Sequence, residues 1–222
     1  VSRDAIELSD PFVKRIITGM PWVDAKWAQT IDGRLVTRAD EPRWISGEVA
    51  RRRVHRIRSR VDATVTGMGT ILADDPMLTA RGVARRRRTA RRVVLDAGLS
   101  IPAIARVVRT AADTPTIVLC SAVAAASPGR VTLESMGVQV IPVAVANGRL
   151  ELGGALRVLA ERFDATNVLL ECGPRLLHGF FSAGLVDEAV VAATGSRPRP
   201  PTTAPAPRPH RGRAEPSPSS AS

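Results

Sequence analysis

The chain has 222 residues, of which 44% are hydrophobic and only 3% aromatic, so one sizeable core built on aliphatic side chains is expected. No apolar run reaches the ~20 residues of a membrane-spanning helix. The N-terminus lacks the basic and then apolar segments of a signal peptide, which favours a cytoplasmic protein. Cys120 and Cys172 are too few for a disulfide framework, and neither has a histidine at metal-ligand spacing, so no metal site is predicted.

The net charge of +11 raises the question of a nucleic-acid partner, because basic patches bind phosphate backbones without sequence specificity. One arginine cluster, formed by Arg85–Arg88 with Arg91 and Arg92, is expected to lie in a solvated loop between strands. No aromatic-stacking motif, zinc finger or helix-turn-helix accompanies the charge. Nucleic-acid binding is therefore the less favoured interpretation.

Residues 1–21 show no clear secondary structure and are interpreted as a linker-like segment that ends in a Gly-Met-Pro turn signal. Alternation of apolar and polar residues over Val23–Ala28 predicts a strand. The turn dipeptide Asp32-Gly33 follows, with a short return strand at Leu35–Thr37. Ser46 is the expected N-cap of a helix over Gly47–Arg60, whose arginines mostly cover a solvated face.

The next stretch combines a strand with a candidate phosphate cradle. Alternation over Val61–Thr66 predicts a strand with one buried face. Gly67 and Gly69 are expected to open a tight turn at positive φ. Thr70 is the expected N-cap of a short helix that Pro76 ends. Backbone N–H groups at such a helix start bind phosphate well, although a plain strand and turn explains the same residues.

The rest of the chain alternates between strands and helices. The expected strands are Arg92–Asp96, Thr116–Cys120, Val138–Val143, Asn167–Glu171 and Leu185–Val191, with helices beginning near Pro128, Leu152 and Pro174. This succession predicts an α/β fold with a largely parallel sheet covered by helices on both faces. From about residue 194 the chain is rich in Pro, Arg and Ser, and residues 194–222 are expected to be a disordered tail.

Five sequence blocks together resemble the reductase domain of bacterial riboflavin biosynthesis. They are KWAQTIDGR (Lys26–Arg34), WISGEVARRRVHRIRS (Trp44–Ser59), GMGTILADDPMLTAR (Gly67–Arg81), RRVVLD (Arg91–Asp96) and LLECGPRLLHGFFSAGLVDE (Leu169–Glu188). The resemblance implies a dihydrofolate-reductase-like domain over residues 22–193. It also implies NADPH as cofactor, reduction of 5-amino-6-(5-phosphoribosylamino)uracil to its ribityl counterpart, and a homodimer.

In many bacteria this domain is the C-terminal half of a bifunctional deaminase-reductase. The His-x-Glu and Pro-Cys-x-x-Cys signatures of the zinc deaminase do not occur in this sequence. The resemblance also implies further strands after about Ala193. In this sequence a Pro- and Arg-rich segment stands in their place. We therefore expect a reductase domain whose last strand is left with an exposed edge.

The resemblance assigns roles to two groups of residues. Those at cofactor positions are Ala28, Trp44, Thr70, Asp74, Gly173, Pro174, Arg175, Leu176, Leu177, His178 and Gly179, and those at substrate positions are Arg58, Leu78, Arg81 and Glu171. Trp44 as a core aromatic and Asp74 as a polar helix end are the alternatives for those two residues. No catalytic acid is predicted, and none of the three histidines is assigned to catalysis.

Two other functions stay open at this point. A dihydrofolate-reductase-like enzyme acting on another small substrate, such as a pterin, would share the fold. A basic binding module that has lost catalysis would share the fold and the charge.

Overall fold

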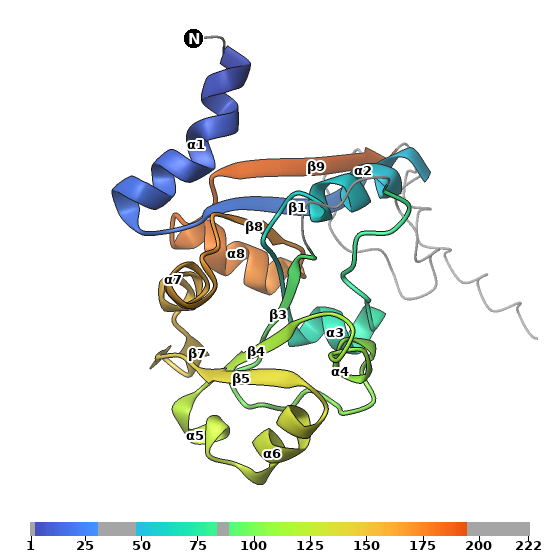
Figure 1. Ribbon diagram of the computed structural model, residues 1–222, viewed down its shortest axis with the longest axis vertical. Coiled ribbons are helices and arrows are strands. Elements are labelled where there is room, and N and C mark those ends of the chain that lie inside the picture. The colour runs from blue at the N-terminus through green and yellow to red at the C-terminus, as the bar shows by residue number, and fades with distance from the viewer. Residues whose placement is uncertain (1–2, 31–47, 84–88, 195–222) are drawn as a thin grey trace, which may run out of the picture.

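The computed structural model describes residues 3–30, 48–83 and 89–194 (Figure 1). Its main sheet has seven strands in the order β5-β4-β3-β2-β8-β1-β9, and every neighbouring pair is parallel. These strands are β1 (Trp22–Thr30), β2 (Ala63–Gly67), β3 (Arg91–Leu95), β4 (Thr116–Cys120), β5 (Val138–Pro142), β8 (Asn167–Leu170) and β9 (Glu188–Thr194). A small antiparallel hairpin pairs β6 (Val145–Ala146) with β7 (Arg149–Leu150).

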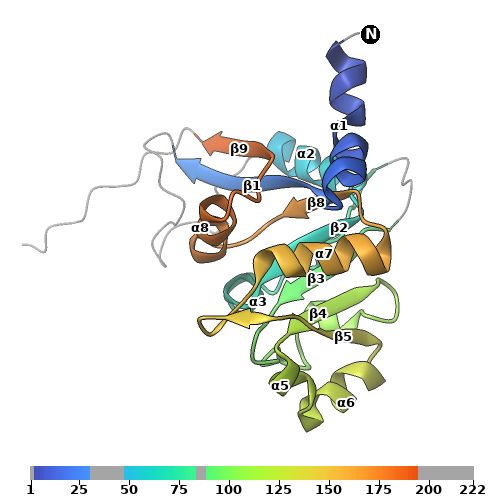
Figure 2. The same ribbon diagram turned by 90° about the vertical axis from the view of Figure 1, so that its left-hand side faces the viewer.

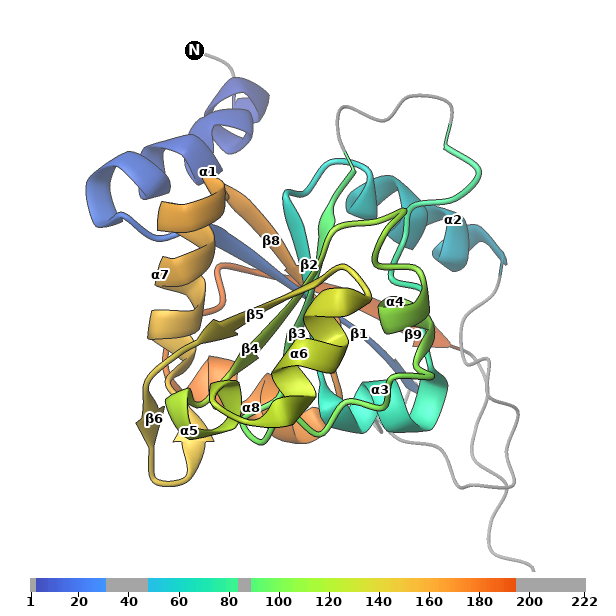
Figure 3. The same ribbon diagram turned by 60° about the horizontal axis from the view of Figure 1, so that its bottom comes forward.

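Helices cover both faces of this sheet, which confirms the predicted fold class (Figure 3). They are α1 (Arg3–Thr18), α2 (Glu48–Arg58), α3 (Met68–Asp74), α4 (Arg106–Arg109), α5 (Ala122–Ala125), α6 (Pro128–Ser135), α7 (Leu152–Phe163) and α8 (Pro174–Ser182). Helices α7 and α8 pack on one face, and α3 to α6 pack on the other. No helix in these described ranges is long and apolar enough to cross a membrane.

Successive side chains of the inner strands enter two separate cores. Val93 lies in the cluster under α7 and α8, whereas its neighbour Val94 lies in the cluster under α3 to α6. Both side chains are fully buried. The β-branched, apolar composition of these strands follows from this burial on two faces.

The prediction that Val61–Thr66 has one buried face is wrong. Thr64 and Thr66 are as fully buried as Val65 between them, because β2 lies inside the sheet and both of its faces are covered. Asp62 is also buried, and one of its carboxylate oxygens accepts hydrogen bonds from the backbone N–H groups of Thr166 and Asn167. The polar residues of this stretch, Asp62, Thr64 and Thr66, are therefore in the protein interior as well.

The junction between β2 and α3 also differs from its prediction. The N-cap is Gly67, with φ of −123°, and neither Gly67 nor Gly69 is at positive φ. Thr70 lies inside the helix, not at its N-cap. Glycine at position 67 has a steric reason instead, since a Cβ built there would lie 2.9 Å from Leu176 Cδ2 in α8. As predicted, the helix stops before Pro76, and Asp75 takes the left-handed conformation at its C-cap.

Arg92 was predicted both in a solvated arginine cluster and at the start of a strand, and only the strand is confirmed. Arg92 is completely buried in β3, and its guanidinium donates to Thr116 Oγ1, Thr110 Oγ1 and the carbonyl oxygens of Val107, Thr110 and Thr114 at 2.6–3.0 Å. Burial lowers the pKa of Arg92 to about 10, so it stays charged at neutral pH. Arg85–Arg88 lie outside the described residues.

The N-terminal segment is helical, although its sequence showed no clear element. In Figures 1 and 2, α1 projects beyond the end of the sheet. Near its C-terminal end, Lys14 pairs with Asp187, and Arg15 donates to the carbonyl oxygen of Ala160 in α7. Gly19, at φ of 70°, then makes the predicted turn into β1.

Strand β9 begins later than predicted. Leu185 and Val186 pack against the core ahead of the strand, and the Asp187 carboxylate accepts the N–H of Val23. Strand β9 pairs with β1, and within the described ranges nothing pairs with its other edge. The predicted turn at Asp32-Gly33, the strand at Leu35–Thr37, the Ser46 cap and the tail lie outside the described residues, apart from Thr194, which ends β9.

Stability is expected to depend on the charge of Asp24, which lies opposite Glu188 in the β1–β9 register. Burial, and next the Glu188 charge, raise its pKa from 3.8 to about 6. Between these values the folded chain holds more protons than the unfolded one, so rising pH lowers stability. Asp24→Asn should therefore stabilise the protein by about 1 kcal/mol near pH 8, allowing for solvent screening. Near pH 4 the same substitution should give no stabilisation. Thermal melts at both pH values check this, and an equal gain at both would contradict it.

A matched pair of glycine substitutions tests the β2–α8 contact. Gly67→Ala should destabilise the protein by about 1 kcal/mol, because the new methyl group must push aside the end of the Leu176 side chain. Gly69→Ala is the control, since a Cβ there meets nothing within 4 Å and alanine favours the helix. Urea denaturation of both variants gives the comparison. Equal stabilities would show that Leu176 moves aside without cost.

Candidate active site

A row of side chains crosses three adjacent strands at the level where β8 ends. Leu170 of β8 pairs in register with Val65 of β2 and with Ala25 of β1. The residues that follow them are Glu171, Thr66 and Lys26. Because side chains alternate along a strand, these three project from the opposite face to their apolar predecessors. The parallel register thus brings Lys26 and Glu171 together across 145 positions of sequence.

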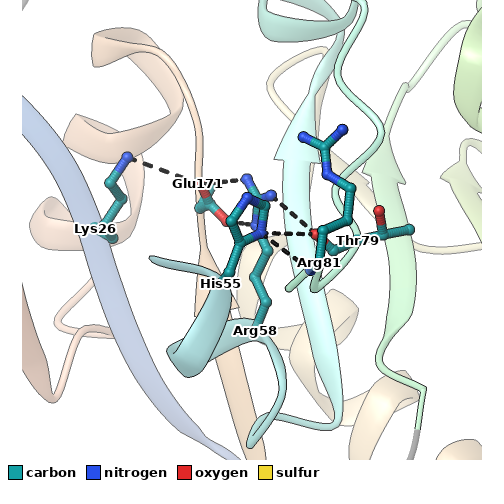
Figure 4. Close-up of polar contacts among 6 residues, drawn as sticks. All are labelled: Lys26, His55, Arg58, Thr79, Arg81 and Glu171. Atoms are coloured by element: carbon teal, nitrogen blue, oxygen red, sulfur yellow. Dashed lines mark hydrogen bonds and ion pairs between the residues drawn. The ribbon is translucent and has the colours of Figure 1, made fainter. Parts of the chain in front are cut away.

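Helix α2 delivers an arginine to this row. Arg58 Nε donates to Glu171 Oε1 at 2.5 Å, and Arg58 Nη2 donates to Glu171 Oε2 at 2.9 Å. Lys26 Nζ lies 3.9 Å from Glu171 Oε2, on the other side of the carboxylate (Figure 4). All three side chains are mostly buried. Two-pronged arginine–carboxylate geometry of this kind is strong and directional, so it fixes α2 against the end of β8.

The same helix holds the segment after α3. Arg58 Nη1 donates to the carbonyl oxygen of Thr79 at 3.3 Å, and His55 Nδ1 lies 3.2 Å from the same oxygen. The backbone N–H of Arg81 donates to His55 Nδ1 at 3.3 Å. The Arg81 side chain is exposed and extends away from Glu171 in Figure 4. None of the described acidic residues pairs with its guanidinium.

Helix α8 begins beside this row with an open N-terminus. Its N-cap is Gly173, which offers no side-chain cap, and Pro174 occupies the first turn. A Cβ at Gly173 would meet nothing within 4 Å, so no described side chain crowds that position. The Gly67–Leu176 approach brings the end of β2 against this turn. Uncapped N–H groups and the positive end of the helix dipole fit an anionic group such as a cofactor phosphate.

The structure brings part of the predicted cofactor set to neighbouring strands. Ala28 lies on β1, Thr70 and Asp74 lie on α3 directly after β2, and residues 173–179 form the N-cap and first turns of α8. Trp44 lies outside the described residues. Strands β1, β8 and β2 are adjacent in the sheet, and α8 and α3 follow β8 and β2 in the chain. Their contact with a cofactor stays a prediction.

Three of the four predicted substrate residues lie together, and the side chain of the fourth, Leu78, is buried in the core. Arg58 and Glu171 are in direct contact, and Arg81 joins them through His55 and Thr79. The Leu78 side chain is 2% exposed and packs in the core under α3 to α6, at a φ of 52° that turns the chain. A ligand would therefore meet the backbone at Leu78.

Lys26 and His55 are site residues that the sequence did not single out. Lys26 looked like a polar position of an alternating strand, and its partner Glu171 is too distant in sequence to suggest a pair. His55 carried a weak signal, since it lies three residues before Arg58 and therefore on the same helix face.

The remaining chemistry of the site is limited. Burial, and next the Glu171 charge, raise the pKa of the Cys172 thiol to about 12, so it is not a nucleophile at neutral pH. Within the described ranges, no three His, Cys, Asp or Glu side chains are grouped to hold a metal ion.

Comparison with known proteins identifies the family. The model of the RibD C-terminal domain matches residues 21–194. Riboflavin biosynthesis protein RibD of Aquifex aeolicus is 33% identical over 188 residues, covering 85% of this chain and 50% of that protein. The Mycobacterium tuberculosis RibD is 37% identical over 173 residues, covering 77% of this chain and 41% of that protein. This chain thus spans about half the length of the curated relatives it matches.

Solved structures of related proteins have the same fold. Acinetobacter baumannii RibD has a TM-score of 0.74 at 28% identity, covering 87% of this chain and 51% of that chain. A Thermotoga maritima diaminohydroxyphosphoribosylaminopyrimidine deaminase/5-amino-6-(5-phosphoribosylamino)uracil reductase has a TM-score of 0.70 at 26% identity, covering 89% of this chain and 51% of that chain. The yeast reductase Rib7, at 17% identity and a TM-score of 0.63, shares the fold and covers 90% of both chains. The family resemblance seen in the sequence blocks is confirmed, and the chain belongs to the RibD C-terminal domain family.

Proposed function

We propose that this chain reduces the ribosyl group of 5-amino-6-(5-phosphoribosylamino)uracil to a ribityl group with NADPH. The observation that carries the proposal is the Lys26–Glu171–Arg58 row beside the uncapped start of α8. Such a row would offer polar groups to a sugar, next to a helix start that would suit a cofactor phosphate. The name of the Thermotoga maritima relative, which includes this uracil reductase activity, supports the same substrate.

The cofactor half of the site rests on α8. When bound, a reduced nicotinamide supplies a hydride. The N–H groups of the first turn of α8 would hold the cofactor phosphates, and the exposed Arg175 in that turn adds positive charge. The short distance between Gly67 and Leu176 would keep the end of β2 close enough to line the same space.

Two arginines would bind the substrate, and within the described residues only one of them, Arg58, is paired with a carboxylate. Arg58 is fixed by Glu171, so it would orient the sugar and the loop at Thr79. Arg81 is exposed, and no described carboxylate engages its guanidinium, so it would bind the phosphate of the phosphoribosyl group. The planar guanidinium can donate two charge-assisted hydrogen bonds to such a phosphate.

The reduction also needs a proton. As C1′ gains a hydride, its bond to the ring oxygen breaks, and that oxygen takes a proton and remains on the opened sugar as a hydroxyl. Lys26 would donate this proton, because its ammonium is held 3.9 Å from the Glu171 carboxylate at the strand end. The Glu171 carboxylate, also tied to Arg58, would position Lys26 for this transfer.

Turnover with defined substrates tests the function. The chain is mixed with NADPH and the phosphoribosylaminouracil, and absorbance of the reduced nicotinamide is followed, with NADH in a parallel sample. Loss of absorbance with NADPH and this substrate is expected. Turnover of a pterin in its place would favour the reductase of another small substrate. Salt-sensitive nucleic-acid binding without turnover would favour the basic binding module.

Arg81→Ala should raise KM for the substrate and leave NADPH affinity nearly unchanged. The lost charged hydrogen bond corresponds to about 1.5–3 kcal/mol. Arg60→Ala is the matched control, because Arg60 is exposed just after α2 and should change neither constant. Equal weakening of both ligands in Arg81→Ala would rule out a phosphate role.

Lys26→Met should lower kcat by about 10²–10⁴ while NADPH still binds, since a positioned proton donor contributes a factor of this size. The chain has one other lysine, Lys14, which pairs with Asp187 at the far end of β1. Lys14→Met should leave kcat unchanged. Single-turnover kinetics of both variants make the comparison, and an unaltered rate in Lys26→Met would exclude it as the donor.

A further inference from the structure

His55 takes no part in the chemistry described above, yet it contacts the segment that carries Arg81. It lies on α2 one turn before Arg58, and both side chains face Thr79 (Figure 4). Its Nδ1 atom lies 3.2 Å from the carbonyl oxygen of Thr79 and 3.3 Å from the backbone nitrogen of Arg81. One ring nitrogen thus meets an acceptor and a donor at almost equal distance.

A single nitrogen cannot serve both partners at once. Nδ1 without a proton accepts the N–H of Arg81, and Nδ1 with a proton donates to the oxygen of Thr79. The Thr79 oxygen already has a donor in Arg58 Nη1 at 3.3 Å. Within the described residues, the Arg81 N–H has no acceptor other than His55 Nδ1. The bonding is therefore most complete when the imidazole is neutral and its proton is on Nε2.

The surrounding charges favour the same state. Arg58 on α2 and Arg81 on the facing segment both disfavour an imidazolium, and Glu171 at the end of β8 favours it. Burial, then Arg58 and then Arg81, lower the pKa of His55 below 6.5. His55 is consequently neutral at pH 7 and above, and it gains a proton only in acidic solution.

We propose that His55 is a positioning residue for the phosphate end of the substrate: as a neutral imidazole it holds the backbone of Arg81, and its protonation releases that backbone. This role rests on the proposed function, because it concerns how Arg81 meets the substrate phosphate. Protonation turns Nδ1 into a donor toward Thr79, so the Arg81 N–H loses its acceptor. Two positive neighbours, Arg58 and Arg81, then repel the new charge.

The direct test needs no substrate. Long-range ¹H–¹⁵N spectra of the ring nitrogens report the tautomer of His55, and the backbone amide signal of Arg81 is followed over the same pH range. A proton on Nε2 at neutral pH, with the Arg81 amide shifting at the same midpoint as His55, is expected. A proton on Nδ1 at neutral pH would overturn the proposal. So would an Arg81 amide signal whose chemical shift does not change as His55 titrates. His178, exposed on α8, is the internal reference.

Two variants separate positioning from folding. His55→Asn places an amide oxygen near the site of Nδ1 and cannot titrate, whereas His55→Leu removes the acceptor. Thermal melts establish that each variant is folded. His55→Leu should raise KM for the phosphoribosylaminouracil about fivefold near pH 8, with the constant for NADPH unchanged. His55→Asn should restore a KM within about twofold of the wild type at that pH.

The pH profile gives a second readout. The substrate phosphate itself loses a charge near pH ~6, so some rise of KM in acid is expected in every variant. Wild-type KM should rise more steeply in acid than that of His55→Asn, because only the wild type also releases Arg81. Identical profiles, or an equal loss of substrate and NADPH affinity in His55→Leu, would overturn the proposal. Absence of wild-type turnover would instead refute the proposed function and leave the spectroscopic test standing.

Discussion

The contact between Glu171 and Arg58 is the interaction on which the site depends. Removing two charges from water costs several kcal/mol each, and their attraction offsets this only when the geometry is good and other hydrogen bonds are satisfied. Here both carboxylate oxygens are engaged by Arg58, and Lys26 lies within 4 Å of one of them. The loss of one partner would leave a mostly buried charge unmatched. Arg58 thus joins helix α2 to the Thr79 segment and, through the Glu171 carboxylate, to the end of β8.

The parallel sheet explains why these groups meet where they do. In such sheets every strand ends at the same edge, and the helix that follows begins there. Helix α3 follows β2, α8 follows β8, and these two strands are neighbours. Uncapped amides, a carboxylate and a lysine therefore reach one place from segments far apart in sequence. The buried guanidinium of Arg92 lies 3.5 Å from the carbonyl oxygen of Met77, two residues before Thr79.

Local patterns predicted most strands and the later helices. The apolar, β-branched run Thr116–Cys120 is β4 to the residue, and the spacing of Leu152 to Phe163 marks α7. The failures concern long-range packing. Polarity alone could not show that Thr64 faces a second core or that Arg92 finds its acceptors in α4 and the segment before β4. In the site, residue types within one block were recognisable, but the Lys26–Glu171 relation exists only through strand register.

The strand order has a consequence for how the chain folds. Strand β1 lies between β8 and β9, its two partners in the sheet, and both come near the end of the described chain. During synthesis β1 must therefore wait for more than a hundred residues before it can hydrogen-bond. Such distant pairings make folding slow, because loop-closure entropy is lost before any contact compensates for it. The Lys26–Glu171–Arg58 row cannot form before this late pairing, because Glu171 follows β8 and reaches Arg58 only when β8 lies between β2 and β1.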